Sequence, residues 1–353
     1  MKKDYIIRIQ NKWEREVAQR WNKFIDPNRY ADKNDIFNYQ RDIITRSKLS
    51  FDEIYELSKP IPEKYVHTYA IDMYEALYYG ALSILLDYAG LSSITMPPMN
   101  IGIQHGYVFE ICNWEKTKME MRNLVWSNKI VDMYHEHTSN PNIFAIGAPF
   151  FYAKSILNDE QLQSEKQRLG KNLLAFPMHS QSNVDTNYNP DKFLNILAEE
   201  RTRFDTVRVC MYWKDVQRGA HKVFQDAGYE CVCNGHIYDP NFLRRQKTLF
   251  ELADATISNG VGSHIGYSLY MGKPHWLIDD NYEYVNTRKS GDAKDLTDVA
   301  KKENFICVKK AFLNNHDYII TQKQKAVIDC FWGISDIKTK EEMKKLFLYL
   351  YGL

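Results

Sequence analysis

The stretch that most constrains the fold lies in the second half of the chain, where residues 253–274 read ADATISNGVGSHIGYSLYMGKP. We interpret it as a strand over 255–258, a glycine-rich turn over 259–262, and a helix that begins at Ser263 or His264 and stops at Gly272. Glycines let backbone N–H groups approach an anion closely, and the first turn of a helix leaves N–H donors unpaired. The pattern predicts either a phosphate seat or an ordinary strand–turn–helix unit without a ligand.

The same alternation of strands and helices runs through the rest of the second half. Strands are expected over 172–180, 206–213, 229–235, 255–260 and 275–279, with helices over 191–204, 215–228, 240–253 and 263–271 between them. Five strands with four intervening helices predict a doubly wound domain, in which ligands bind beyond the carboxyl ends of the strands. The polar residues that follow those strands are His179, Ser180, Ser182, Lys214, Asn234, His236, Asn259, Gly262, Ser263 and His264, and the helix adds Ser268.

The first half has a helical beginning and then a shorter alternation. A stripe of Trp13, Val17, Trp21 and Phe24 has helical spacing, and the apolar run over 65–91 predicts a buried helix. Strand, strand, helix and strand are expected over 99–110, 123–127, 129–138 and 142–151. These segments predict a second parallel α/β sheet.

We therefore divide the chain into an N-terminal domain over 1–155, a polar linker over 156–171, a C-terminal domain over 172–330, and a helix over 331–353 that packs across both domains. One more strand is expected over 304–310. The amphipathic segment over 337–353 has a basic face and an aromatic face, so a peripheral membrane contact is its alternative role.

The strand-end residues have different expected roles. His179, Ser180 and Ser182 can donate hydrogen bonds to a phosphate, and Lys214 can add a positive charge. A histidine that caps local backbone is the alternative for His179. In the first half, His105 lies in a Gln-His-Gly loop and suits general-base work near neutral pH.

Two further alternatives concern that first-half loop. Glu110 is the competing base, and a surface carboxylate is its simpler role. A hydrogen-bonded loop histidine remains the alternative for His105.

Charge and cysteine usage exclude several classes of function. The chain has 353 residues, with 46 Lys and Arg against 45 Asp and Glu, so its net charge of +1 gives no general attraction to nucleic acid. The strand-end set contains no carboxylate cluster, so no metal site is expected. Of the six cysteines, Cys231 and Cys233 have only His236 nearby, which is too few ligands for zinc. We expect reduced thiols and a cytoplasmic protein, since no apolar run reaches the ~20 residues of a membrane span.

The block FLRRQKTLFELADATISNGVGSHIGYSLYMGKPHWLID resembles the donor-binding segment of GT-B glycosyltransferases over about forty residues. The QHG loop and the His-Ser loop are similar to those of bacterial capsule and lipopolysaccharide enzymes such as Kdo transferases and sialyltransferases. The resemblance implies two Rossmann-like doubly wound domains, with a donor nucleotide on the second. Here His179 is followed by Ser180 rather than proline, and Ser258, Ser263 and Ser268 form no Ser-Ser pair.

From these observations we expect an inverting, metal-independent glycosyltransferase without a cofactor. It would move a sugar from a nucleotide-sugar donor to a surface glycan or a lipid-linked glycan, in the cytoplasm or in peripheral contact with the inner membrane. CMP-sugars are the favoured donors, and UDP- and GDP-sugars are the alternatives. A sugar-nucleotide epimerase or hydrolase, and a non-catalytic nucleotide-binding scaffold, are the competing functions.

Overall fold

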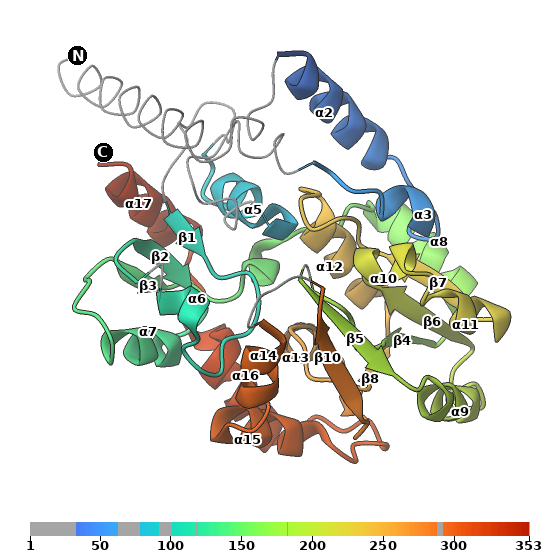
Figure 1. Ribbon diagram of the computed structural model, residues 1–353. Helices are drawn as coiled ribbons and strands as arrows, with labels where there is room; N and C mark the ends of the chain where they lie inside the picture. The colour runs from blue at the N-terminus through green and yellow to red at the C-terminus, as the bar shows by residue number, and fades with distance from the viewer. Residues whose placement is uncertain are drawn as a thin grey trace.

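The computed structural model describes residues 33–62, 78–91, 101–116, 119–181, 183–287 and 292–352. These residues form a mixed α/β structure with two parallel sheets and one antiparallel strand pair (Figure 1). The predicted stripe of Trp13, Val17, Trp21 and Phe24, residues 65–77 of the helix expected over 65–91, and Ser182 lie outside the described residues.

The larger sheet has five parallel strands in the order β7-β6-β4-β8-β9. The strands are β4 (Asn172–Phe176), β6 (Thr206–Met211), β7 (Glu230–Cys233), β8 (Ala255–Ser258) and β9 (His275–Leu277). The first strand of this half, β4, lies at the centre, and the chain builds outward on one side through β6 and β7 and on the other through β8 and β9. The boundary between β4 and β8 is therefore the topological switch point of the sheet, where ligands of doubly wound folds bind.

Helices cover both faces of this sheet, because successive strand residues point to opposite faces. Leu173 and Ala175 belong to a core cluster that contains Phe193 of α9 (Asp191–Glu200). Leu174 lies in another cluster, with residues of α12 (Phe242–Leu252) and α13 (His264–Tyr270), among them Ile265. The doubly wound arrangement predicted for this half is confirmed.

The smaller sheet has three parallel strands in the order β1-β2-β3. They are β1 (Ile101–Ile103), β2 (Arg122–Val125) and β3 (Ile143–Ala145). The elements around them are α5 (Ala81–Tyr88), the short α6 (Asn113–Lys116), α7 (Asn128–His135) and the 3-10 turn η2 (Pro149–Tyr152). Ile101, Leu124 and Ile143 belong to the same core cluster as Leu174, so one hydrophobic core joins the two sheets.

The third sheet was not predicted. It is an antiparallel pair of β5 (Val184–Tyr188) and β10 (Tyr282–Asn286), against which α14 (Asp292–Val299) packs. The segment VDTNY of β5 follows β4 after a short loop and is largely polar. Its pairing with a strand nearly a hundred residues later leaves no local signal in the sequence.

Three other segments differ in detail from the expectations. The strand expected over 304–310 is wrong, because this segment lies in helix α15 (Glu303–Phe312), whose buried Phe305, Val308 and Phe312 have helical spacing. The single helix expected over 215–228 is split into α10 (Trp213–Gln217) and α11 (Lys222–Asp226). Gly219 separates them with a φ of 81°, which a helix does not accommodate. Much of the segment expected as a linker forms helix α8 (Asp159–Leu169), which packs against α12.

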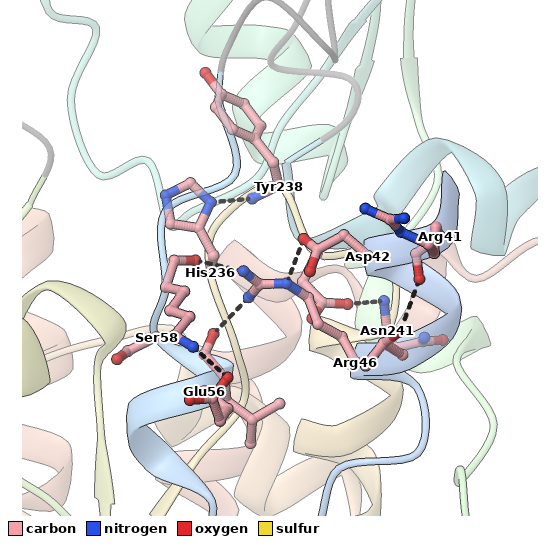
Figure 2. A network of polar contacts seen from close by, with 12 residues as sticks. Arg41, Asp42, Arg46, Glu56, Ser58, His236, Tyr238 and Asn241 are labelled. Carbon is pink, nitrogen blue, oxygen red and sulfur yellow. Dashed lines mark hydrogen bonds and ion pairs between the residues drawn. The ribbon is translucent and has the colours of Figure 1, made fainter. Parts of the chain in front are cut away.

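Two N-terminal helices are described, α2 (Lys33–Arg46) and α3 (Ile54–Leu57). Helix α3 packs on β7 of the larger sheet, and its Ile54 and Leu57 share the core cluster of Leu173. The buried guanidinium of Arg46 holds the two helices together (Figure 2). It donates to the Asp42 carboxylate at 2.7 Å and to the backbone oxygens of Leu57 and Lys59 at 3.1 and 2.9 Å.

A second buried arginine ties this layer to the sheet. Arg245 of α12 donates to the backbone oxygen of Arg46 at 2.7 Å, to Asn234 O at 3.0 Å and to the Asp239 carboxylate at 2.8 Å. The N-terminal helices are thus anchored where β7 ends.

The C-terminal helices lie against the smaller sheet and the core. They are α15, α16 (Gln322–Trp332), the 3-10 turn η3 (Ile334–Asp336) and α17 (Lys340–Leu350). Helix α16 contacts α7 and α13, and α17 contacts α5. No helix in the described part of the chain is long and apolar enough to cross a membrane.

Trp332 and Gly333 connect α16 to both sheets. The Trp332 ring is fully buried, and its Nε1 donates to the backbone oxygen of Ser263 at 3.0 Å. A Cβ on Gly266 would lie 2.4 Å from that ring, and a Cβ on Gly333 would lie 1.9 Å from the backbone oxygen of Trp126. The backbone of α16 therefore approaches β2 as closely as a glycine permits.

We expect Gly333→Ala to destabilise the fold more than Gly272→Ala. Both glycines have a left-handed φ, at 69° and 70°, so each alanine costs about 1–2 kcal/mol of backbone energy. Gly272 has open space around its Cα, whereas a Cβ on Gly333 collides with backbone. Urea unfolding of the two variants measures the difference, and equal free energies of unfolding would contradict this close approach.

Candidate functional site

A cavity of about 500 Å³ lies between the loop that follows β1 and the carboxyl edge of the larger sheet. From the first half it is lined by His105 and Glu110. Its lining from the sheet edge is formed by residues that follow successive strands: His179 after β4, Tyr212 after β6, Asn234 after β7, and Gly262, Ser263 and His264 after β8. The switch point of the sheet thus opens into this cavity.

The turn over 259–262 needs its glycines because the side chains of Met178 and His264 lie too close to leave room for a Cβ. A Cβ on Gly260 would lie 2.2 Å from Met178 Sδ, and a Cβ on Gly262 would lie 2.6 Å from two atoms of the His264 ring. The φ of neither residue is in the left-handed region, so close approach rather than backbone conformation requires glycine here.

Asn259 joins this turn to the loops on either side. Its Oδ1 accepts from the backbone N–H of Met178 at 2.6 Å, and its Nδ2 donates to the Asp280 carboxylate at 3.0 Å. The side chain, 1% exposed, is used within the protein, so any contact of Asn259 with a ligand falls to its backbone.

His179 is half-buried beside the turn. Its Nδ1 lies 2.7 Å from the backbone oxygen of Ser180, to which a protonated Nδ1 donates, and its ring packs on Tyr212 at 4.6 Å between centroids. The hydrogen bond fixes the tautomer and leaves Nε2 as the ring nitrogen that can contact a ligand.

His264 begins helix α13 and is buried. Its ring stacks on Phe176 at 4.6 Å with the planes 9° apart. Its Nε2 has no hydrogen-bond partner among the described residues. Burial holds the pKa of His264 well below its usual value, and the neighbouring His275 lowers it further. The group is therefore a neutral imidazole with an uncommitted nitrogen, which is a polar atom that a ligand could satisfy.

The structure places three other predicted donor residues outside the cavity lining. The buried Ser180 hydroxyl donates to Asp215 at 2.6 Å. Lys214 forms an ion pair with Asp185 at 2.9 Å and donates to Gln181 O at 2.7 Å. Ser268 is fully buried in α13 and donates to the backbone oxygen of Lys273. Within the described residues these side chains stabilise the fold around the site.

The two candidate bases both line the cavity. His105 is positioned by Gln104, whose Oε1 accepts from the Trp126 N–H at 2.8 Å and whose Nε2 donates to Gly106 O at 2.8 Å. The His105 ring meets the edge of Tyr78 at 4.7 Å. Glu110 lies farther along the same loop, on the same cavity wall. Both side chains are therefore placed to act as the base.

Tyrosines line much of the cavity, and the sequence analysis did not single them out. They are Tyr78, Tyr79, Tyr107, Tyr134, Tyr212, Tyr267 and Tyr284. Tyr79 has a left-handed backbone φ of 61°, which is an unusual conformation for an aromatic residue. Its backbone N–H donates to Ile237 O at 2.7 Å. A Cβ on the next residue, Gly80, would lie 2.1 Å from Pro240 O. Gly80, inside the apolar run over 65–91, is the N-cap of α5, so in the described part of that run the α-helix begins only at Ala81.

The charges around the cavity are unevenly distributed. Its charged lining residues are Glu110, Glu115 and Asp292, and no lysine or arginine belongs to the lining formed by described residues. Glu110 lies on the loop after β1, Glu115 on α6 and Asp292 at the start of α14, whereas the sheet edge contributes histidines. Within the described ranges, no three His, Cys, Asp or Glu residues are grouped so that they could hold a metal ion.

Comparison with known proteins adds little to this geometry. No family model matches the chain, and no curated protein has a matching sequence. Among solved structures, the crystal structure of TarM matches with a TM-score of 0.33 and 14% sequence identity, covering 72% of this chain. The match covers 51% of TarM, so the chain spans about half of that protein. At this TM-score the function has to be argued from the site itself.

We expect the protein to lose stability as the pH falls from about 6.5 toward 3. Burial lowers the pKa of His236 to about 3, with a contribution from Arg46, and burial lowers the pKa of His275 to about 3. Both histidines take up a proton in the unfolded state near pH 6.5 but not in the folded state, so unfolding becomes easier with acid. Each contributes a slope of about 1.4 kcal/mol per pH unit.

His236→Asn isolates one of these contributions, because the amide oxygen can replace Nδ1 as the acceptor from Tyr238 N–H. The dependence of the unfolding free energy on pH between 6.5 and 5 should become shallower in this variant. His137→Gln, at an exposed position on the surface, is the matched control and should retain the wild-type slope. An unchanged slope in His236→Asn would show that His236 is protonated in the folded protein.

Proposed function

We propose that this protein is a glycosyltransferase that moves a sugar from a nucleotide-sugar donor to a glycan acceptor. The observation that carries the proposal is the cavity, in which the switch point of a doubly wound sheet faces a loop that offers two candidate bases, His105 and Glu110. A donor bound at the sheet edge and an acceptor bound near that loop would meet in one enclosed space. Aromatic walls of the kind formed by the tyrosines suit sugar rings and nucleobases.

The donor phosphate would bind at the Gly262–His264 side of the cavity. The donors available there are the Ser263 hydroxyl, Nε2 of His264 and the backbone N–H groups of the turn. Because Nδ1 of His179 donates to Ser180 O, Nε2 of His179 donates to a phosphate only when both ring nitrogens carry a proton. A CMP-sugar has one phosphate charge and a nucleoside-diphosphate sugar has two. Because the described lining has no lysine or arginine, the smaller charge suits this cavity better, and CMP is our favoured nucleotide.

The proposed reaction is an inverting displacement without a metal ion. The acceptor hydroxyl attacks the anomeric carbon, the bond from that carbon to the phosphate oxygen breaks, and the nucleotide leaves with the electron pair. His105 or Glu110 takes the proton of the hydroxyl. Hydrogen-bond donors at the turn stabilise the charge that grows on the leaving phosphate. The acceptor would be a bacterial surface glycan or its lipid-linked precursor, reached from the cytoplasm.

We expect His179→Ala and Ser263→Ala each to weaken nucleotide binding by about 10- to 100-fold, since a hydrogen bond to a charged group contributes about 1.5–3 kcal/mol. Thermal shift with CMP, CDP, UDP and GDP identifies the nucleotide, and calorimetry then gives the affinities. Ser155→Ala is the matched control for the serine, because its hydroxyl contacts Thr248 outside the cavity. Full affinity in both site variants would remove the phosphate seat from the proposal.

The identity of the base is a separate prediction. We expect the loss of the true base to lower kcat by about 10²- to 10⁴-fold with little change in nucleotide affinity. His105→Gln and Glu110→Gln, assayed side by side for sugar transfer and for CMP binding, separate the two residues. Nucleotide binding with no transfer to any glycan would favour a scaffold, and release of free sugar that neither variant changes would favour a hydrolase without these bases.

A further inference from the structure

A chain of buried polar side chains lies directly beneath the phosphate-binding turn. Nε2 of His275 lies 3.0 Å from the Ser258 hydroxyl, which in turn donates to the backbone oxygen of Gly260 at 2.9 Å. Nδ1 of His275 lies 2.7 Å from the Thr256 hydroxyl. All three side chains are 0% exposed. His275 therefore acts on the turn through Ser258, which holds the carbonyl of Gly260 in place.

From Thr256 the series of hydrogen bonds continues into helix α13. The Thr256 hydroxyl lies 2.6 Å from the hydroxyl of Ser268, which is also fully buried and donates to the backbone oxygen of Lys273 at 2.9 Å. The Thr256 hydroxyl also lies 3.5 Å from Pro274 O, which is too long for a normal O–H···O hydrogen bond, so we do not count this contact. Both ends of the chain are thus carbonyl oxygens, which can only accept.

This series of hydrogen bonds has one more contact than it has protons to fill them. Five hydrogen bonds link Gly260 O, Ser258, His275, Thr256, Ser268 and Lys273 O in that order. Three hydroxyls supply three protons and a neutral imidazole supplies one, so one of the five contacts has no proton. An imidazolium supplies the fifth. With both ring nitrogens protonated, every contact in the chain becomes a hydrogen bond.

Two opposing effects decide whether His275 holds that proton. Burial disfavours the charge and lowers the pKa of His275 in the free protein to about 3. An unfilled contact between buried polar atoms favours protonation, and so would a negative charge in the cavity.

The titratable and charged groups on the packed elements do not supply such a charge. The nearest is His264 of α13, with its ring 5.4 Å away, and α13 otherwise carries the tyrosines Tyr267 and Tyr270. On α15, Lys309 pairs with Asp279 at 2.6 Å, whereas Glu303, Cys307 and Lys310 are exposed to solvent. The facing residues of β8 are neutral hydroxyls. The remaining source of negative charge is a ligand.

We propose that His275 is a positioning residue that takes up a second proton when the phosphate of a nucleotide binds at the Gly262–His264 turn. The proton enters from solvent with the anion, completes the five hydrogen bonds and places a positive charge beneath the site. This inference rests on the proposed function, because it needs an anionic ligand in the cavity. It also supplies the positive charge that the described cavity lining lacks.

Ser268→Ala gives a specific test of the proton count. Without the Ser268 hydroxyl, three contacts remain around His275, and Ser258, Thr256 and a neutral imidazole supply three protons. The variant thus satisfies the chain without the extra proton while keeping His275 in place. A purely structural role for the network predicts no such change in protonation.

The experiment is calorimetry of CMP binding in buffers with different ionisation enthalpies, which gives the number of protons taken up. Other histidines of the cavity can contribute to the wild-type value, so the difference between variants is the measurement. We expect Ser268→Ala and His275→Gln each to take up about one proton fewer than the wild type, and His137→Gln to match the wild type. Nitrogen NMR of the wild-type imidazole rings gives the same answer if His275→Gln does not fold, since both nitrogens of His275 should become protonated with CMP.

Equal proton uptake in the wild type and in Ser268→Ala, or an unchanged His275 ring in the NMR spectrum with CMP bound, would overturn this inference and leave the proposed function standing. Failure of CMP, CDP, UDP and GDP to bind the wild type would instead overturn the proposed function, and the inference with it.

Discussion

The Asn259 side chain makes the contacts on which the geometry of the site depends. Its two hydrogen bonds connect the loop after β4, the turn after β8 and the segment after β9, which leave the sheet in different directions. Because the chain builds outward in opposite directions from the β4–β8 boundary, a hollow at this edge is unavoidable. One buried amide keeps its walls in register, and the glycines at 260 and 262 let those walls approach Met178 and His264.

The wall of the cavity opposite the larger sheet is formed by the His105 loop, and contacts in the hydrophobic core hold this loop in place. Trp332 is buried against both sheets: its indole donates to Ser263 O, and its ring lies 6.2 Å from that of Trp126. The backbone after Trp126 contacts Gly333, so the C-terminal helix α16 fixes the β2 end of the smaller sheet relative to the turn. The loop of His105 is in turn held by Trp126 through Gln104. A short series of packed contacts therefore sets the spacing between His105 and the glycine turn over 259–262.

The sequence allowed the larger sheet to be predicted because each of its strands is short, apolar and bounded by turn residues. The switch point and the approach of His179, Gly262, Ser263 and His264 followed from that sheet. Helix α15 was mistaken for a strand because NFICVKK is rich in β-branched and aromatic residues, and the spacing of Phe305, Val308 and Phe312 shows only over a longer window. Ser180 and Lys214 were expected at the site because they follow predicted strands and can bind a phosphate. Their partners Asp215 and Asp185 are distant in sequence or on an unpredicted strand, so local pattern could not show that these groups were already engaged.

The distribution of charge in the cavity gives a ligand only one favourable orientation. Glu110, Glu115 and Asp292 lie on the wall formed by the loop after β1, by α6 and by α14, and they repel an anion. The opposite wall carries the neutral imidazole of His264, the Ser263 hydroxyl and the backbone N–H groups of the turn, which can donate to an anion without first giving up a salt bridge. A nucleotide would therefore turn its phosphate toward the sheet edge and away from the carboxylates. In the proposed reaction, this orientation would bring the anomeric carbon between the leaving phosphate and the candidate bases.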